Sequence, residues 1–256
     1  MLKFFTEVKE LFHEIGELCD LFMSGNCEVI NKPIREPLKM EIGKNKVIEP
    51  NSSMPEAQLR VAVELKALVI YENSKGTPTE QYELEALTKA QSEEESYKTK
   101  PQIKRIHAIL DYVGTGKKVL DCAGGSGYIG SLLQQAGNYV VVLDHSEIQL
   151  LRAKWLRKLK TMLGEVYFLP YPDHSFDVII MADILDRCET MSTALFEAER
   201  VCKRDGQIIV TVPIGAAPRN IGGSLRQIQC TKIDGGGDES FVLSIKNIKP
   251  KDVLSV

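Results

Sequence analysis

The chain has 256 residues, of which 43% are hydrophobic and 26% charged; this composition excludes a disordered protein and allows a large buried core. Its 32 Lys and Arg residues against 35 Asp and Glu residues give a net charge of −3, which excludes a general attraction to nucleic acid or to an anionic membrane. The six cysteines form no C-x-x-C pair, so we expect no metal site, no disulfide framework and a reducing, cytoplasmic environment. No segment reaches the roughly 18 consecutive apolar residues of a membrane span.

The first hundred residues predict a helical and acidic region. Residues 2–22 carry apolar side chains at three- and four-residue steps, typical of an amphipathic helix, and the glutamates among them exclude a signal sequence. Prolines predict an irregular stretch over residues 26–55, and further helices are expected over about 55–73 and 78–97. The first hundred residues carry 13 basic and 18 acidic side chains, whereas the remainder carries 19 and 17. We therefore expect a helical extension over residues 1–99.

From about residue 101, short apolar runs alternate with helical patterns, which predicts a second domain over residues 100–256. Strands separated by helices indicate parallel β-α-β units, and hence an α/β fold with a doubly wound, mostly parallel sheet. Two apolar runs around a glycine-rich turn predict an antiparallel C-terminal hairpin that closes one edge of the sheet. The expected strands are 117–123, 138–144, 176–183 and 206–213, the expected helices are 101–113, 127–137, 147–163 and 192–203, and the hairpin covers 225–247.

A glycine-rich loop follows the first expected strand, in the segment VLDCAGGSG over residues 119–127. Glycines let the backbone approach a ligand that a Cβ atom would block, and the helix that follows presents free N–H groups. Residues 125–130 also satisfy the dinucleotide pattern G-x-G-x-x-G, so the loop alone does not decide the ligand. Asp121 would repel a pyrophosphate and favours a cationic ligand, such as a sulfonium that bears an ammonium group. Asp144, at the end of the second strand, offers two oxygens for the hydroxyls of a ribose.

These residues resemble the first motif of the class I S-adenosylmethionine-dependent methyltransferases, which reads roughly V/I-L-D/E-x-G-x-G-x-G. The match departs at Ala123, where the family usually has its first glycine. Residues 169–180 (LPYPDHSFDVII) look like the family's LPFPDxSFDVV run, and residues 199–213 (ERVCKRDGQIIVTVP) are similar to its R-V-L-K-P-G-G-x-L turn. The resemblance covers about residues 100–250, and in it Asp144 stands where the family's ribose acceptor lies.

The resemblance implies S-adenosyl-L-methionine as the cofactor. Glu165 stands near the position of a family aspartate that meets the adenine, although a solvated loop glutamate fits the sequence equally well. Tyr167 and Phe168 could flank the adenine or pack in the core, and core packing is favoured. The residues expected at the cofactor are Asp121, Ala123, Gly124, Gly125, Gly127, Asp144, His145, Glu165 and Ala182.

Catalytic groups are expected after the fourth strand, at the carboxyl edge of the sheet where α/β proteins gather their ligands. Many small-molecule methyltransferases read S-x-V-L-H-H there, with a histidine that can act as a base, but this chain has Asp186 and Arg187 in place of the two histidines. A partly desolvated Asp183 or Asp186 could accept a proton, because desolvation raises the pKa of a carboxyl group. The plainer interpretation is that Asp186 and Arg187 form an ordinary ion pair or cap the next helix.

Two other features are expected to be structural. Basic residues at positions 152–160 could be mistaken for a nucleic-acid patch, but helical spacing spreads them over a solvated face. Tyr97 could close over the cofactor, although a linker role is favoured.

The leading hypothesis is an S-adenosylmethionine-dependent methyltransferase that acts on a small metabolite, sugar or natural product, at oxygen. Residues 1–99 would cover the active site, select the substrate or mediate a homodimer, and no nucleic-acid or membrane partner is expected. The second hypothesis is a catalytically inactive methyltransferase-like binding or scaffold module, which Ala123 and the missing histidines motivate. The third, a nicotinamide-dependent oxidoreductase, is disfavoured by Asp121.

Overall fold

The computed structural model describes residues 49–184, 188, 190–213, 228–233 and 240–246. The predicted helix over residues 2–22, most of the irregular stretch over 26–55, and Asp186 lie outside these residues. The helices are α3 (Glu56–Ser74), α4 (Glu80–Ser96), α5 (Lys100–Val113), α6 (Tyr128–Gln135), α7 (Glu147–Leu156) and α8 (Met191–Val201). The strands are β1 (Lys118–Cys122), β2 (Tyr139–Asp144), β3 (Lys160–Leu163), β4 (Phe176–Ala182), β5 (Cys202–Pro213), β6 (Ile228–Ile233) and β7 (Ser240–Lys246). No helix among the described residues is long and apolar enough to cross a membrane.

The strands form one sheet in the order β3-β2-β1-β4-β5-β7-β6. The five strands from β3 to β5 are parallel, which confirms the predicted α/β class. β7 pairs antiparallel with β5, and β6 pairs antiparallel with β7. Strand order reverses direction at β1, which lies between β2 and β4. In open α/β sheets such a switch point opens a crevice at the carboxyl ends of the strands.

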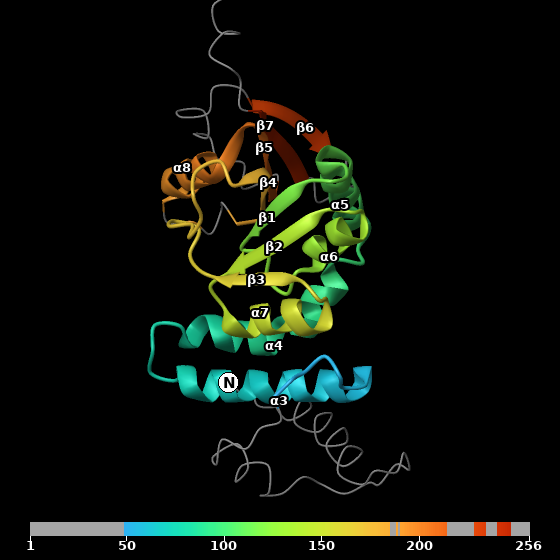
Figure 1. Ribbon diagram of the computed structural model, residues 1–256, viewed down its shortest axis with the longest axis vertical. Coiled ribbons are helices and arrows are strands. Elements are labelled where there is room, and N and C mark those ends of the chain that lie inside the picture. Colours follow the sequence, from blue (N-terminus) through green and yellow to red (C-terminus); the bar gives the residue numbers. More distant parts are fainter. Residues whose placement is uncertain (1–48, 185–187, 189, 214–227, 234–239, 247–256) are drawn as a thin grey trace, which may run out of the picture.

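Helices cover both faces of the sheet, with α5 and α6 on one face and α8 on the other (Figure 1). Side chains alternate along each strand, so Leu120 and Cys122 pack toward α8, whereas Val119 packs toward α5 and α6. Because both faces are buried, the central strands are continuous apolar runs. This explains why they were visible in the sequence.

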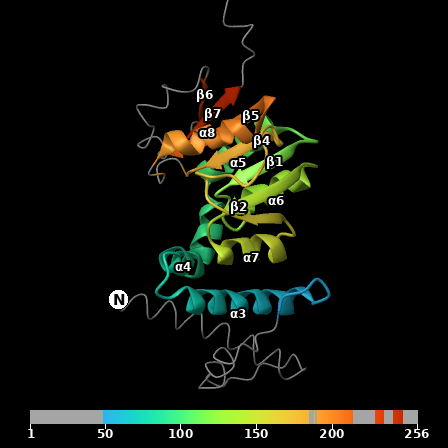
Figure 2. The same ribbon diagram turned by 60° about the vertical axis from the view of Figure 1, so that its left-hand side comes forward.

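The helices α3 and α4 lie beyond the β3 edge of the sheet and pack against α7 (Figure 2). Ala67, Leu68, Ala86 and Leu87 of this pair form a small core with Ile148 of α7.

Next to this small core, Arg152 of α7 forms hydrogen bonds with both α3 and α4. Its Nε and Nη2 donate to Glu64 of α3 at 3.0 and 2.6 Å, and its Nη1 donates to the carbonyl oxygen of Ala86 at 2.6 Å. Since its side chain is only 4% exposed, the prediction that Arg152 lies on a solvated face is wrong.

The predicted long helix over residues 147–163 is also wrong in its second half. α7 ends at Leu156, and the chain turns at Lys158, whose φ of +56° is left-handed. Residues 160–163 then form β3, which pairs in parallel with β2. These four residues join an edge strand because the neighbouring β2 offers backbone partners, and such pairing overrides local helical preference.

Candidate functional site

A cavity of about 620 Å³ opens at the carboxyl ends of the first four strands, at the switch point beside β1. One side of it is formed by the loops that follow the strands, and the other side by α4, α5 and the link between them. Among the residues predicted for the site, those that line the cavity are Ala123, Gly125, Asp144, His145, Glu165, Ala182 and Asp183.

The carboxylate of Asp144 accepts hydrogen bonds from the loop that follows β1 and from the loop that follows β2. Its Oδ2 accepts a hydrogen bond from the backbone N–H of Gly125 at 2.9 Å, and its Oδ1 accepts one from the N–H of Ser146 at 2.9 Å. The side chain is nearly buried yet lines the cavity. A carboxylate has about four lone-pair positions, so Asp144 retains the capacity to accept bonds from ligand hydroxyls.

The glycines of the loop after β1 serve packing as well as ligand access. Gly127 begins the turn into α6 with a φ of +77°, and a Cβ atom there would lie 2.5 Å from Cδ1 of Leu159. A Cβ atom at Gly124 would lie 2.7 Å from Cγ of Asp121. Ala123, where the methyltransferase motif has glycine, takes a left-handed φ of +51°. The loop therefore has the glycine-type backbone even where the residue is alanine.

Asp121 lies beneath this loop, and its side chain is not among those that line the cavity. It is 1% exposed, and its Oδ2 has no hydrogen-bond partner among the described residues. Burial, together with the nearby charge of Asp144, raises the pKa of Asp121 to about 7, against a smaller lowering by the backbone of Gly130. A cation bound above the loop would favour the ionised form of this carboxyl.

Asp183 follows β4 and forms an ion pair with Arg105 of α5. Its Oδ1 also accepts a hydrogen bond from Oγ1 of Thr211 at 3.0 Å, and its backbone is left-handed with a φ of +55°. Arg105 is buried, its Nε has no partner among the described residues, and burial lowers the pKa of its guanidinium. Both side chains line the cavity, which therefore holds a fixed pair of opposite charges. Arg105 was not among the residues predicted for the site.

Aromatic side chains close the opposite side of the cavity. Tyr82 of α4 packs against His145 with ring centroids 4.1 Å apart, and Tyr97 stacks on Tyr128 at 4.4 Å with planes 4° apart. Tyr97 lines the cavity. It lies in the link between α4 and α5, as expected, and from there it also forms part of the cavity wall.

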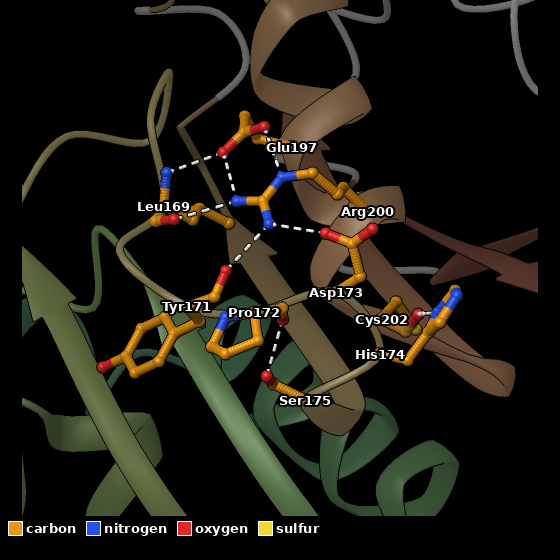
Figure 3. Close-up of polar contacts among 9 residues, drawn as sticks. All are labelled: Leu169, Tyr171, Pro172, Asp173, His174, Ser175, Glu197, Arg200 and Cys202. Atoms are coloured by element: carbon orange, nitrogen blue, oxygen red, sulfur yellow. Dashed lines mark hydrogen bonds and ion pairs between the residues drawn. The ribbon is translucent and has the colours of Figure 1, made fainter.

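The loop between β3 and β4 contacts α8, so the two motif-like segments over residues 169–180 and 199–213 lie together (Figure 3). Arg200 of α8 donates to the carbonyl oxygens of Leu169 and Tyr171 at 2.9 and 2.8 Å and to Asp173 at 3.0 Å. Glu197 accepts from the N–H of Leu169 at 2.8 Å, and its hydrogen bonds with Arg200 lower its pKa. This network anchors the second half of the loop to α8.

The first half of the same loop faces the cavity with Glu165, Val166 and Tyr167. Phe168, for which core packing was favoured, is 76% exposed, so that expectation is wrong. Phe168 pairs with Glu165 in an isolated antiparallel bridge between these two residues. Among the described residues, no group of three or more His, Cys, Asp or Glu side chains could hold a metal ion.

Residues 120–210 match the family model described as a methyltransferase domain. The malonyl-[acyl-carrier protein] O-methyltransferase of Erwinia billingiae is 35% identical over 95 residues, which cover 37% of this chain and 38% of that protein. The demethylmenaquinone methyltransferase of Mycobacterium marinum is 32% identical over 107 residues, which cover 41% of this chain and 46% of that protein. The chain thus matches less than half the length of these relatives.

Two solved structures have similar folds over a larger share of the chain. The TehB-like SAM-dependent methyltransferase of Corynebacterium glutamicum is 20% identical with a TM-score of 0.46, and the match covers 56% of this chain and 86% of that one. The PH0226 protein of Pyrococcus horikoshii is 18% identical with a TM-score of 0.47, and the match covers 59% of this chain and 93% of that one.

S-adenosyl-L-methionine, the cofactor of this family, combines a nucleoside, a sulfonium and an amino-acid end, and the residues present suit these three parts. Asp144 has spare acceptor capacity for hydroxyls, Asp121 holds an unpartnered buried oxygen beneath the loop, and Arg105 with Asp183 offers both signs of charge. The matched residues 120–210 contain the glycine loop and the strand ends that build this cavity. This chain therefore contains a region, residues 120–210, that matches a methyltransferase domain.

Proposed function

We propose that this chain is an enzyme that binds S-adenosyl-L-methionine in the cavity and transfers its methyl group to a small-molecule acceptor. The observation that carries the proposal is the arrangement of two carboxyl groups around the glycine loop. Asp144 lines the cavity at the end of β2, and Asp121 lies buried below the loop with an unpartnered oxygen. A ribose can donate hydrogen bonds to Asp144, and a positive sulfonium above the loop would favour the ionised form of Asp121, whereas a pyrophosphate would be repelled by both carboxyl groups.

Three parts of the site would hold the three parts of the cofactor. Asp144 would accept hydrogen bonds from the ribose, and Glu165 with Tyr167, after β3, would border the adenine. Arg105 would bind the carboxylate of the amino-acid end, and this contact would release Asp183 from its ion pair with Arg105.

The cofactor supplies an electrophilic methyl group on sulfur, so the protein needs mainly to align the acceptor and remove its proton. Asp183 lines the cavity and is our proposed proton acceptor for a hydroxyl or acid group, with Asp186 as a second proposed base. Oxygen as the target atom is supported by the name of the Erwinia relative, an O-methyltransferase.

The alternative is a methyltransferase-like scaffold without catalysis, which the left-handed Ala123 favours, because a glycine position of the binding motif has been lost. Calorimetry with S-adenosylhomocysteine, the demethylated product, tests the proposal, with NADH as the comparison ligand. We expect binding of S-adenosylhomocysteine and none of NADH. No binding of S-adenosylhomocysteine at millimolar concentration would reject the enzyme, and binding of NADH alone would favour an oxidoreductase.

A further inference from the structure

Glu83 of α4 is a buried carboxylate that lies outside the part of the chain matched by the family model. It is 2% exposed, although α4 as a whole is polar. Its Oε2 accepts hydrogen bonds from Oγ of Ser146 at 2.8 Å and from the N–H of Ile148 at 3.1 Å, and its Oε1 accepts one from the N–H of Glu147 at 2.8 Å. Three hydrogen-bond donors at the start of α7 therefore bind the one carboxylate that Glu83 contributes from α4.

The donors belong to the start of α7, where free N–H groups and the helix dipole favour negative charge. Ser146 is the N-cap residue of the same helix, since its Oγ accepts a hydrogen bond from the N–H of Gln149 at 3.2 Å. A buried carboxylate is stable only when it is fully hydrogen-bonded. Glu83 meets this condition at the start of α7, so α4 and α7 are held together at this point.

The same contact continues into the proposed cofactor site. The N–H of Ser146 donates to Oδ1 of Asp144, and Oδ2 of Asp144 accepts from the N–H of Gly125, both at 2.9 Å. A continuous series of hydrogen bonds thus runs from α4 through Ser146 to the carboxylate at the end of β2 and on to the glycine loop. Next to this series, Tyr82 packs on His145.

We propose that Glu83 is a positioning residue for the cofactor: it fixes Ser146 and thereby orients the Asp144 carboxylate toward the ribose hydroxyls. This inference rests on the proposed function, because it requires a nucleoside in the cavity. The helices α3 and α4 would then be part of the binding site. The ribose pocket would be shaped by these helices together with the region that matches the family model.

The test is calorimetry on the full chain with S-adenosylhomocysteine and with its 2′-deoxy analogue, which lacks one ribose hydroxyl. In the wild type we expect tighter binding of the complete ribose. Glu83→Gln keeps the side-chain length but turns an amide donor toward the N–H groups, and we expect S-adenosylhomocysteine to bind about tenfold more weakly. The 2′-deoxy analogue should be affected less, so the preference for the complete ribose shrinks. In the Asp144→Ala background, Glu83→Gln should not alter that preference further.

Glu80→Gln is the matched control, because Oε2 of Glu80 also accepts a backbone N–H, from Gly76 at 2.7 Å, but this bond stays within the α3–α4 pair. We expect it to leave both affinities within twofold. If Glu83→Gln does not fold, Ser146→Ala removes one bond of the series and should shift the preference in the same direction by less. An unchanged preference in the folded variants overturns the positioning role, whereas a wild type that binds neither ligand overturns the proposed function and this inference with it.

Discussion

The buried carboxyl of Asp121 predicts an unusual pH dependence of stability, which the variant Asp121→Asn isolates. Asparagine has nearly the same shape and cannot ionise. Its buried amide changes stability by an amount that does not depend on pH. Any pH-dependent difference between the variant and the wild type therefore reports the titration of this single carboxyl.

The magnitude follows from the pKa, which is 3.8 in an exposed aspartate and about 7 for Asp121 in the folded chain. A raised carboxyl pKa stabilises the fold at low pH, and this contribution is lost as the pH rises to the folded value. Between the two pKa values, the folded chain binds one proton more than the unfolded chain, so the free energy of unfolding falls by about 1.4 kcal/mol per pH unit. From pH 5 to pH 8 the wild type loses about 3 kcal/mol through this group.

The assay is urea-induced unfolding of the full chain at intervals from pH 5 to pH 8, followed by circular dichroism. We expect the stability of Asp121→Asn relative to the wild type to increase by about 3 kcal/mol over this range. Asp111→Asn is the control, because Asp111 is an exposed carboxyl on α5, and its difference from the wild type should stay flat. A difference for Asp121→Asn that is equally flat would show that the carboxyl is ionised throughout, and would refute the argument from burial.

Four further results are expected. Ala123→Gly relieves a left-handed alanine and should raise the free energy of unfolding by about 1 kcal/mol, measured by urea unfolding. Gly127→Ala should lower it by about 2 kcal/mol or more in the same assay, because the new Cβ meets Leu159. Asp144→Ala should weaken S-adenosylhomocysteine binding at least tenfold by calorimetry, while circular dichroism shows a folded chain. The affinity of the wild type for S-adenosylmethionine should rise between pH 6 and pH 8, and Asp121→Asn should abolish that rise.

The parts of the site that the sequence predicted are those built from consecutive residues. The glycine loop, the acidic strand ends and the residues after β4 are local patterns, and a parallel sheet brings the carboxyl ends of its strands to one edge. Ala123, Asp144 and Asp183 therefore line one cavity although they follow three different strands. The strand β3 was missed for the opposite reason. Its identity depends on pairing with β2, which no local pattern contains.

The residues missed by sequence reasoning are charged groups on the buried faces of helices. Arg105 precedes Ile106 and stands four residues before Ile109, both of which are buried, so the apolar stripe of α5 contains an arginine. Glu83 occupies the same kind of place on α4, three and four residues before the buried Ala86 and Leu87. Helical periodicity could have revealed both as charges placed inside the protein.

Periodicity cannot identify the interaction partner of either charge, because each partner lies on an element that is distant in the sequence. Arg105 meets Asp183 beyond β4, and Glu83 meets the first turn of α7. An unpaired buried charge costs several kcal/mol, so its presence on an apolar stripe implies a complementary group across the interface. In this chain both complementary groups lie at the cavity. A charge on a buried helix face therefore indicates that a complementary group lies across the interface, and Glu83 of α4 meets such a group at the start of α7.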